Sequence, residues 1–233
     1  MIFEKNIKYF GQEIFEKFKN FNIAVIGAGG TGTPVCQLLV SLGIHKITVY
    51  DYDKIDYSNL NRQFMYDENE VGLDKSEILV KKISKRHKNL IVTSEKTRID
   101  EENFIKLQKY DFIFDCTDSF NTKFFLNDLC IKNHKILVHS GVNLHQGQAG
   151  IINFKTGGCL RCFIKKKPEE VENINVAHNV MLAATLQVEE FVNFLSQEYY
   201  GGLVFFKTKP NIFIKKIQYP DKCDFCGGYR SGN

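Results

Sequence analysis

Two short motifs in this sequence have the residue types and spacing that hold ligands in proteins. A glycine-rich segment runs from Gly27 to Gly32, and four cysteines form two Cys-x-x-Cys pairs, Cys159/Cys162 and Cys223/Cys226. A glycine-rich turn between a strand and a helix lets backbone N–H groups approach a phosphate. Four thiolates suit tetrahedral Zn²⁺ and leave no open position for a substrate, which indicates a structural metal. The chain is therefore predicted to hold a phosphate-containing ligand and a structural metal ion.

The composition is typical of a soluble globular protein. The chain has 233 residues, of which 43% are hydrophobic and 25% are charged, and its formal net charge is +4. This length suits one α/β domain with a buried core. The basic residues form no long stripe, so nucleic acid is not expected as a partner. No apolar run is long enough for a signal peptide or a membrane span, which predicts a cytoplasmic protein with reduced cysteines.

Strands and helices alternate along the first part of the chain. A helix is expected over Glu4–Lys19, and strands are expected at Asn22–Ile26, Lys46–Asp51, Asn89–Ser94, Asp111–Asp115 and Lys135–His139. Further helices are expected at Thr31–Leu42, Asp74–His87 and about Phe120–Asn133. This alternation predicts an α/β fold with a Rossmann-like, doubly wound and mostly parallel sheet.

The pattern changes beyond Gly147. It predicts a strand over Gln148–Phe154, a loop over Lys165–Glu170, a long helix over Val176–Glu198, and strands at Leu203–Lys207 and Asn211–Ile217. These late strands are expected to extend the same sheet. The chain is interpreted as one domain, with an N-terminal helix in 1–20, a nucleotide-binding core in 21–146 and a zinc-bearing C-terminal β extension in 147–233.

The glycine loop alone does not identify the nucleotide. Asp51 ends the second expected strand, about 20 residues after the loop, where dinucleotide enzymes carry an acid that binds a ribose hydroxyl. A ribose contact is the same for NAD and for ATP, so Asp51 does not discriminate between them. The alternative is that Asp51 caps a turn. The candidate phosphate-loop residues are Gly27, Gly29, Gly30 and Gly32.

The segment after Asp51 favours a triphosphate over NAD. Its side chains suit phosphates and sugar hydroxyls, and they belong to Asp53, Ser58, Asn59, Arg62, Gln63 and Lys75. An NAD enzyme needs no arginine and lysine here, whereas cleavage of a triphosphate requires positive charge to stabilise the departing pyrophosphate. Taken singly, Arg62 would be explained by a surface salt bridge and Lys75 by a solvated position at a helix start.

A carboxylate follows the fourth expected strand. Thr117 and Asp118 come directly after this strand, at the sheet edge where open α/β sheets bind ligands. Magnesium binds through one or two carboxylates together with the phosphates of a nucleotide. Asp118 is therefore the candidate magnesium ligand.

In this order, these motifs resemble those of the activating-enzyme family that includes ThiF, MoeB, HesA and the adenylation half of ubiquitin-activating enzymes. The resemblance covers nearly the whole chain and rests on Gly27–Gly32, Asp51, Ser58–Gln63, Gly72–Lys75, Cys116–Asp118, Ser140–Gly141 and both cysteine pairs. It implies a homodimeric enzyme that uses Mg-ATP to attach AMP to a carboxylate. In this family the carboxylate is usually the C-terminal glycine of a ubiquitin-like sulfur carrier.

The resemblance also implies roles for individual residues. The glycines form the phosphate loop, and Asp51 holds the ribose. Asn59, Arg62 and Lys75 contact the phosphates, Asp118 holds magnesium, and Arg62, Lys75 and Asp118 form the catalytic set. The nucleotide-binding set also includes Asp53, Ser58, Gln63 and Thr117. The cysteines bind zinc, with iron or a redox role as the alternative.

The chain lacks the additional cysteine that many relatives use for a thioester or persulfide. No cysteine lies between Cys162 and Cys223, and Glu170 occupies roughly that place. The other thiols are interpreted as buried small residues, and they belong to Cys36, Cys116 and Cys130. The chemistry is therefore expected to stop at the acyl-adenylate, or the sulfur is expected to arrive on another protein.

Two more departures bear on the substrate. No arginine precedes Arg62, so Lys5 or Lys8 would have to replace the N-terminal arginine of relatives. Ser119 stands where many relatives have asparagine, and Asn121–Lys123 is the candidate to restore that phosphate contact. The alternatives are another carboxylate substrate, either a peptide or a small molecule such as a guanylylpyridinol, a non-catalytic nucleotide-binding protein, or an NAD enzyme.

Overall fold

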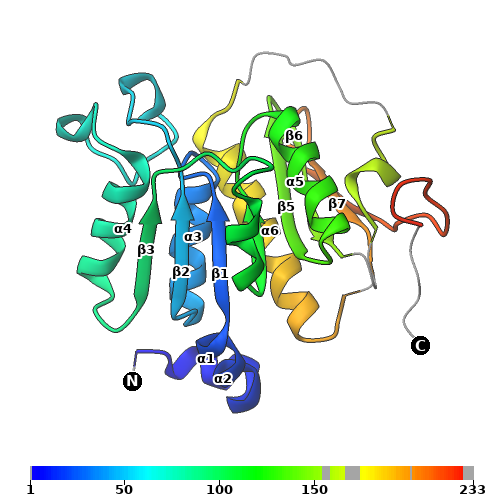
Figure 1. Cartoon of the computed structure of the whole chain (residues 1–233), viewed down its shortest axis with the longest axis horizontal. Coiled ribbons are helices and arrows are strands. Elements are labelled where there is room, and N and C mark those ends of the chain that lie inside the picture. The colour runs from blue at the N-terminus through cyan, green and yellow to red at the C-terminus, as the bar shows by residue number, and fades with distance from the viewer. Residues whose placement is uncertain (1, 154–157, 166–173, 200, 228–233) are drawn as a thin grey trace.

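One sheet organises the part of the chain that the computed structural model describes, residues 2–153, 158–165, 174–199 and 201–227 (Figure 1). Its strand order is β3-β2-β1-β4-β5-β6-β7-β8. The parallel strands are β1 (Asn22–Ile26), β2 (Lys46–Tyr50), β3 (Ile91–Glu95), β4 (Phe112–Asp115) and β5 (Ile136–Asn143). The antiparallel extension consists of β6 (Gln146–Ile152), β7 (Leu203–Lys207) and β8 (Phe213–Ile217). The predicted fold class is confirmed.

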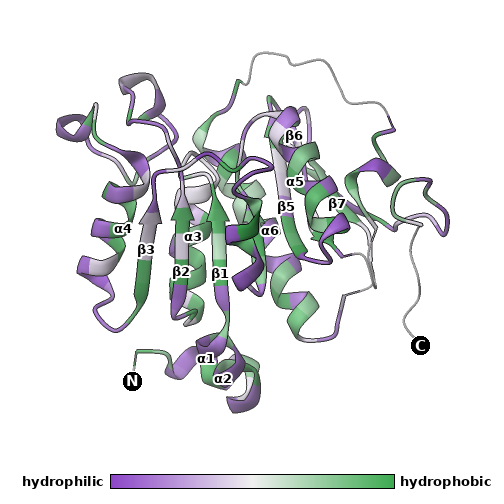
Figure 2. Cartoon of the chain, in the orientation of Figure 1, coloured by the Kyte–Doolittle hydropathy of each residue, from purple (hydrophilic) through white to green (hydrophobic). Residues whose placement is uncertain are grey.

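Helices cover both faces of the sheet. Alternate residues of a strand point to opposite faces, so Val25 packs with one hydrophobic cluster and its neighbours Ala24 and Ile26 with the other. The first cluster includes residues from α2 (Gln12–Asn20), α3 (Gly32–Leu42), α4 (Lys75–Arg86) and α6 (Ala177–Leu195). The second includes residues from α5 (Phe120–Lys132) and the 3-10 segment Phe104–Lys109. Figure 2 shows the apolar middle of β1 and the mixed colouring of α4, whose outer face meets water.

The topology creates a crevice at the end of β1. Strand β1 lies between β2 and β4. The chain runs from β1 to β2 on one side of β1, and after β3 it returns to β4 on the other side. At such a reversal, the loops that follow the carboxyl ends of neighbouring strands diverge and leave space for a ligand. The glycine loop follows β1, Asp51 follows β2, and Cys116–Asp118 follows β4. The sequence motifs therefore converge on one edge of the sheet.

Several elements differ from the sequence-based expectation. The expected helix over Glu4–Lys19 is two helices, α1 (Glu4–Phe10) and α2, because Gly11 has φ 81° and ends the first one. Strand β5 extends to Asn143 and pairs with β6 in a hairpin. Most of the expected Lys165–Glu170 loop, including Glu170, lies outside the described residues. Within the described residues, no helix is long and apolar enough to cross a bilayer.

Candidate nucleotide site and cysteine cluster

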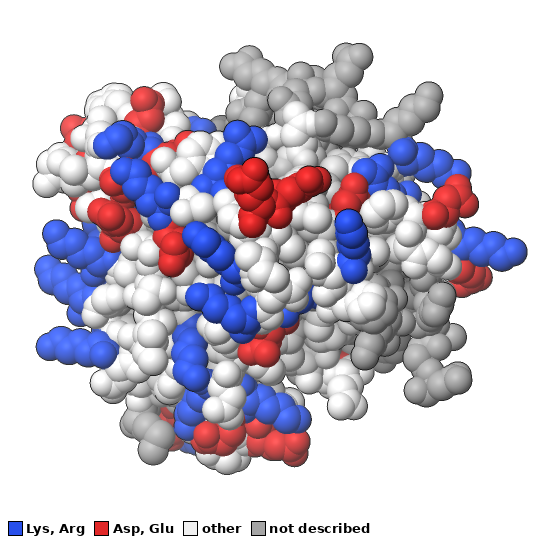
Figure 3. All heavy atoms as spheres, in the orientation of Figure 1, with Lys and Arg blue, Asp and Glu red and all other residues white. Residues whose placement is uncertain are grey.

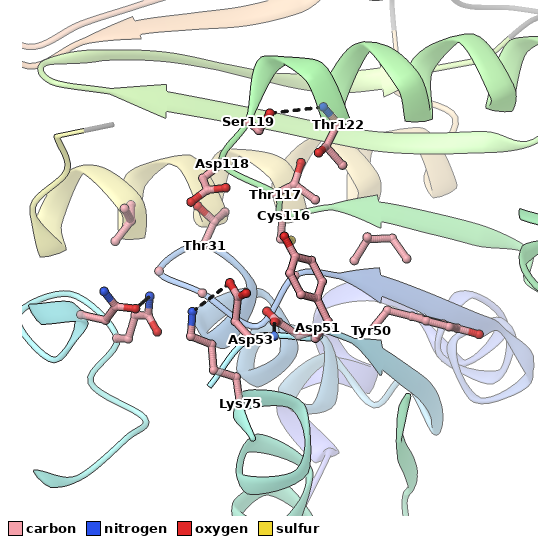
Figure 4. Close-up of a pocket in the computed structure, with 18 of the residues that line it drawn as sticks. Thr31, Tyr50, Asp51, Asp53, Lys75, Cys116, Thr117, Asp118, Ser119 and Thr122 are labelled. Atoms are coloured by element: carbon pink, nitrogen blue, oxygen red, sulfur yellow. Dashed lines mark hydrogen bonds and ion pairs between the residues drawn. The ribbon is translucent and has the colours of Figure 1, made fainter. Parts of the chain in front are cut away.

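A cavity of about 300 Å³ opens at the carboxyl edge of the sheet (Figure 4). This volume lies in the range of small-molecule sites. Most of the predicted nucleotide-binding residues line it, namely Gly27, Gly29, Gly30, Asp51, Asp53, Asn59, Arg62, Gln63, Lys75, Thr117 and Asp118. Two predicted residues, Gly32 and Ser58, are not part of its lining. The structure thus brings together side chains from four separate segments of the sequence.

The glycine loop is shaped by close backbone packing. Gly27 has φ 101°, and a Cβ atom at this position would lie 2.7 Å from the carbonyl oxygen of Cys116. A Cβ atom at Gly32 would overlap the carbonyl oxygen of Gly27. Gly32 therefore serves the packing of α3 against the loop, whereas Gly29 and Gly30 face the cavity.

Asp51 fastens the glycine loop to the end of β2. Its Oδ2 accepts a hydrogen bond from the Ala28 N–H at 2.6 Å, and its Oδ1 accepts one from the Asp53 N–H at 2.7 Å. Burial raises the pKa of Asp51, against the opposing effect of these two backbone donors. Asp51 caps a turn, as the alternative interpretation proposed. Each carboxylate oxygen can still accept another hydrogen bond, and Asp51 also lines the cavity.

Lys75 is held beside the cavity and is not a solvated surface lysine. It is the first residue of α4, and only 6% of its surface is exposed. Its Nζ lies 3.4 Å from Oδ2 of Asp53, a contact drawn in Figure 4. A buried ammonium with one loose ion pair has spare donors for an anionic ligand.

The segment Ser58–Gln63 presents three side chains to the cavity. Arg62 donates from Nη1 to the Ser58 carbonyl at 3.2 Å and to Asn61 Oδ1 at 2.9 Å. Within the described residues Arg62 forms no ion pair, so the surface salt bridge is absent there. Gln63 is buried and donates to Asn59 Oδ1 at 3.3 Å, while its own Oε1 has no partner among the described residues. Such an orphaned polar atom indicates room for a ligand donor.

Asp118 faces this basic wall from the turn after β4. Figure 4 shows it on the opposite side of the cavity from Asp53 and Lys75. The chemistry of the donor fits magnesium, because a carboxylate at a phosphate site is a usual ligand for that ion. Ser119 caps α5 by accepting hydrogen bonds from the backbone of Asn121 and Thr122.

The prediction that Asn121–Lys123 contacts a phosphate is wrong for Lys123. This lysine does not line the cavity, because its Nζ lies 3.3 Å from both carboxylate oxygens of buried Asp115. Only Thr122 of this segment reaches the cavity.

Sequence reasoning missed a tyrosine that positions the loop. Tyr66 is buried, and its hydroxyl donates to the Ala28 carbonyl at 2.7 Å and to the Lys75 carbonyl at 3.1 Å. It thereby ties the glycine loop to the start of α4. Nothing in the pattern identified it, since it follows a polar segment without periodicity.

The N-terminal lysines lie away from this cavity. Figure 1 places α1 and α2 at the amino-terminal edge of the sheet, whereas the cavity opens at the carboxyl edge. Lys8 pairs with Glu4 at 2.6 Å on the surface of α1. Figure 3 shows acidic and basic side chains interspersed over this end of the molecule. Neither Lys5 nor Lys8 lines the cavity of its own chain.

The four predicted metal ligands form one cluster. Their sulfur atoms all lie within 4.8 Å of one another, with separations of 3.9 Å for Cys159–Cys162, 3.9 Å for Cys159–Cys223 and 3.6 Å for Cys162–Cys226. A tetrahedral zinc site with Zn–S bonds of about 2.3 Å has S–S separations of about 3.8 Å. The separations far exceed a disulfide bond of about 2.05 Å. The cluster is therefore compatible with zinc.

The three other thiols are buried, as expected. Cys36 and Cys130 are fully buried, and Cys116 is 6% exposed. Burial raises the pKa of the Cys36 thiol to about 12 and that of the other two above their usual value. Buried neutral thiols of this kind behave as small apolar residues.

Comparison with known proteins agrees with this geometry. The family model of the ThiF family matches residues 3–226. The chain belongs to the ThiF family. This membership confirms the resemblance that the sequence motifs indicated.

Two curated relatives and one solved structure illustrate the similarity. Adenylyltransferase and sulfurtransferase MOCS3 of Xenopus laevis is 31% identical over 90% of this chain and 49% of its own length. A probable molybdopterin-synthase adenylyltransferase of Porphyra purpurea is 37% identical over 67% of this chain and 41% of its own. The chain thus spans about half the length of such relatives or less. The crystal structure of E. coli MccB with ATP has a TM-score of 0.82 at 21% identity, over 97% of this chain and 75% of that one, which shows a shared fold.

Proposed function

We propose that this chain is an ATP-dependent adenylyltransferase that activates a carboxylate as an acyl-adenylate. One observation carries the proposal: a single cavity is lined by Arg62, Lys75 and Asp118. These residues supply two cations for phosphate charge and one carboxylate for a metal ion. The adenylyltransferase names of the relatives support the same activity.

The reaction needs no nucleophilic side chain. A carboxylate oxygen of the substrate attacks the α-phosphorus of ATP, and the bond from that phosphorus to the bridging oxygen of the β-phosphate breaks. The products are the mixed anhydride and pyrophosphate, and no proton is transferred. Arg62 and Lys75 hold the negative charge that accumulates on the departing pyrophosphate, and Asp51 binds the ribose. Magnesium held by Asp118 would neutralise phosphate oxygens.

The proposed substrate is the C-terminal glycine of a ubiquitin-like sulfur carrier. Two observations support it. The relatives at 31% and 37% identity carry names from sulfur transfer and molybdopterin synthesis. The chain has no cysteine between Cys162 and Cys223, which agrees with a reaction that ends at the adenylate. A peptide or small-molecule carboxylate is the alternative substrate.

We further propose a zinc ion in the cysteine cluster and a homodimer. Zinc would hold the ends of the C-terminal segment together without taking part in the reaction. Exposed apolar side chains in the loop beside the cavity supply area for a second copy, and they belong to Tyr57, Phe64, Val71 and Leu73.

Pyrophosphate exchange tests the activity directly. Wild-type chain with Mg-ATP and a Gly-Gly-terminated carrier should incorporate labelled pyrophosphate into ATP, and Lys75→Ala or Arg62→Ala should lower this rate about 100-fold or more. The matched control is Lys82→Ala, on the same helix, because Lys82 pairs with Asp67 and Glu70 and does not line the cavity. Full exchange in the Lys75 and Arg62 variants would contradict the assigned roles. Mass spectrometry of the adenylate formed from each offered carboxylate identifies the substrate.

A further inference from the structure

A group of buried polar side chains lies directly behind the cavity wall, at the carboxyl end of β4 and at the neighbouring middle of β5. It consists of Asp115, Lys123, His139 and Gln187, here called the polar clamp, and each of these residues is at most 4% exposed. None of the four lines the cavity. Nucleotide binding as described above gives them no role.

On one face of the sheet, Asp115 and Lys123 connect β4, β5 and α5. Lys123 Nζ lies 3.3 Å from both oxygens of Asp115 and donates to the Ser140 carbonyl at 2.5 Å. His139, which is the register partner of Asp115 in the neighbouring strand, contributes Nδ1 at 2.8 Å from Asp115 Oδ2. One ammonium group thus bridges the end of β4 and the middle of β5.

On the other face, Gln187 of α6 bridges the same two strands. Its Nε2 donates to the carbonyls of Asp115 at 3.1 Å and Val138 at 2.7 Å, and its Oε1 accepts from the Ser140 hydroxyl at 2.9 Å. The end of β4 and the middle of β5 are therefore held from both faces of the sheet. The residues that follow these bonded positions line the cavity, Cys116–Ser119 after the end of β4 and Gly141–Val142 within β5.

The clamp continues into the turn that carries Asp118. Asp115 Oδ1 accepts from the Thr117 N–H at 3.1 Å and from the Thr117 hydroxyl at 2.7 Å. These bonds fix the backbone one residue before Asp118. A change in the position of Asp115 would therefore move the Asp118 carboxylate relative to the opposite wall.

Stability alone does not explain a buried ion pair. Burial would raise the pKa of Asp115, but the Lys123 charge and the His139 hydrogen bond outweigh it and lower that pKa to about 2. Desolvating two charges consumes most of the attraction between them, and apolar side chains of similar volume often stabilise a core as well or better. The pair does, however, impose a direction and a spacing that apolar packing does not provide.

We propose that Lys123 is a positioning residue that fixes the Asp118 turn relative to the Gly141–Val142 wall, so that the cavity is preorganised for Mg-ATP. This inference rests on the proposed function and adds a residue that does not touch the nucleotide. Partners that orient a metal ligand typically account for 10- to 100-fold in metal affinity or activity. Lys123→Met is expected to weaken Mg-dependent ATP binding by roughly this factor.

The chain contains a matched control for this substitution. Lys216 pairs with Glu190 at 2.7 Å, and the two side chains are 28% and 5% exposed, but this pair joins β8 to α6 and bonds none of the residues that line the cavity. The experiment compares Lys123→Met with Lys216→Met by isothermal titration of ATP at several magnesium concentrations, by pyrophosphate exchange and by thermal unfolding. Both variants should lose stability. Only Lys123→Met should require about 10-fold or more magnesium for half-maximal ATP binding and show a lower kcat.

A second variant distinguishes loss of positioning from loss of folding stability. The double variant Asp115→Asn/Lys123→Met buries no unpaired charge, so it should regain stability while Mg-dependent ATP binding stays weak. A Lys123→Met or double variant that binds Mg-ATP like the wild type overturns the positioning role and leaves the proposed function intact. A wild-type chain that binds no Mg-ATP overturns both.

Discussion

Removing one hydroxyl group, in Tyr66→Phe, should loosen the glycine loop without touching the nucleotide. The Tyr66 hydroxyl donates to the Ala28 and Lys75 carbonyls at 2.7 and 3.1 Å. Asp51 is the second anchor of this residue, because its carboxylate accepts a hydrogen bond from the Ala28 N–H. The substitution therefore removes one of two anchors from the loop and leaves the packed ring in place.

The size of the effect follows from the burial of this hydrogen bond. Tyr66 is 4% exposed, so solvent cannot replace the lost donor. A lost buried hydrogen bond of this kind costs about 1 to 1.5 kcal/mol of unfolding free energy. For a chain of this size, that loss lowers Tm by about 2 to 6 °C. If ATP must restore order to the loop, about 1 kcal/mol is lost from binding, a roughly fivefold rise in Kd.

Tyr219→Phe is the control that separates stability from binding. Tyr219 is also 4% exposed and donates to the Ile151 carbonyl at 2.9 Å, but this bond is made to β6 and not to the glycine loop or to a residue that lines the cavity. Thermal unfolding should show similar losses in both variants, whereas titration with Mg-ATP should show weaker binding only for Tyr66→Phe. Equal ATP affinity in Tyr66→Phe and the wild type would refute the reasoning that this hydroxyl preorganises the loop.

Three further predictions concern other parts of the chain. Gly32→Ala should lower the free energy of unfolding by at least about 2 kcal/mol in urea titrations, because the new Cβ overlaps the Gly27 carbonyl. Gly29→Ala should cost less, because its new Cβ would lie 3.6 Å from Nε2 of Gln63, an ordinary contact distance. Purified wild type should contain about one zinc per chain by metal analysis, and Cys226→Ser should lose it; unchanged zinc content would contradict the cluster as its site. Burial lowers the pKa of His139, so as the pH falls the unfolded chain takes up a proton at this residue before the folded chain does. The free energy of unfolding therefore decreases below about pH 6.5, and His139→Gln should flatten this part of the pH–stability curve.

The local sequence was sufficient to predict the parallel half of the sheet. Strand β1 is a short apolar run that ends in glycines, and its predicted bounds, Asn22–Ile26, match the structure. The same holds for the end of β4 at Asp115, because a buried strand and a polar turn have distinct compositions. The cavity lining was predictable for a related reason, since parallel strands deliver their carboxyl ends to one edge.

Features that depend on tertiary contacts were not predictable in this way. The periodicity of Glu4–Lys19 continues across Gly11, but the backbone there adopts a conformation that ends α1. Lys123 lies on a helix with no clear apolar face, so its burial gives no local signal. Its partner Asp115 belongs to the preceding strand, and only the fold brings the two charges together, which turns an expected phosphate ligand into a buried ion pair. Tyr66 gives no local signal, because its two acceptors are backbone carbonyls at Ala28 and Lys75.

The charge pattern of the cavity bears on which nucleotide it suits. Its described lining contains three basic side chains, Arg62, Lys75 and Arg98, and three acidic ones, Asp51, Asp53 and Asp118. Asp51 is bonded to backbone N–H groups and Asp53 is paired with Lys75, whereas Asp118 faces the cavity from the other side. A carboxylate in that place repels the diphosphate of a dinucleotide unless a cation lies between them. A triphosphate that arrives with magnesium supplies that cation, so the position of Asp118 favours Mg-ATP over NAD.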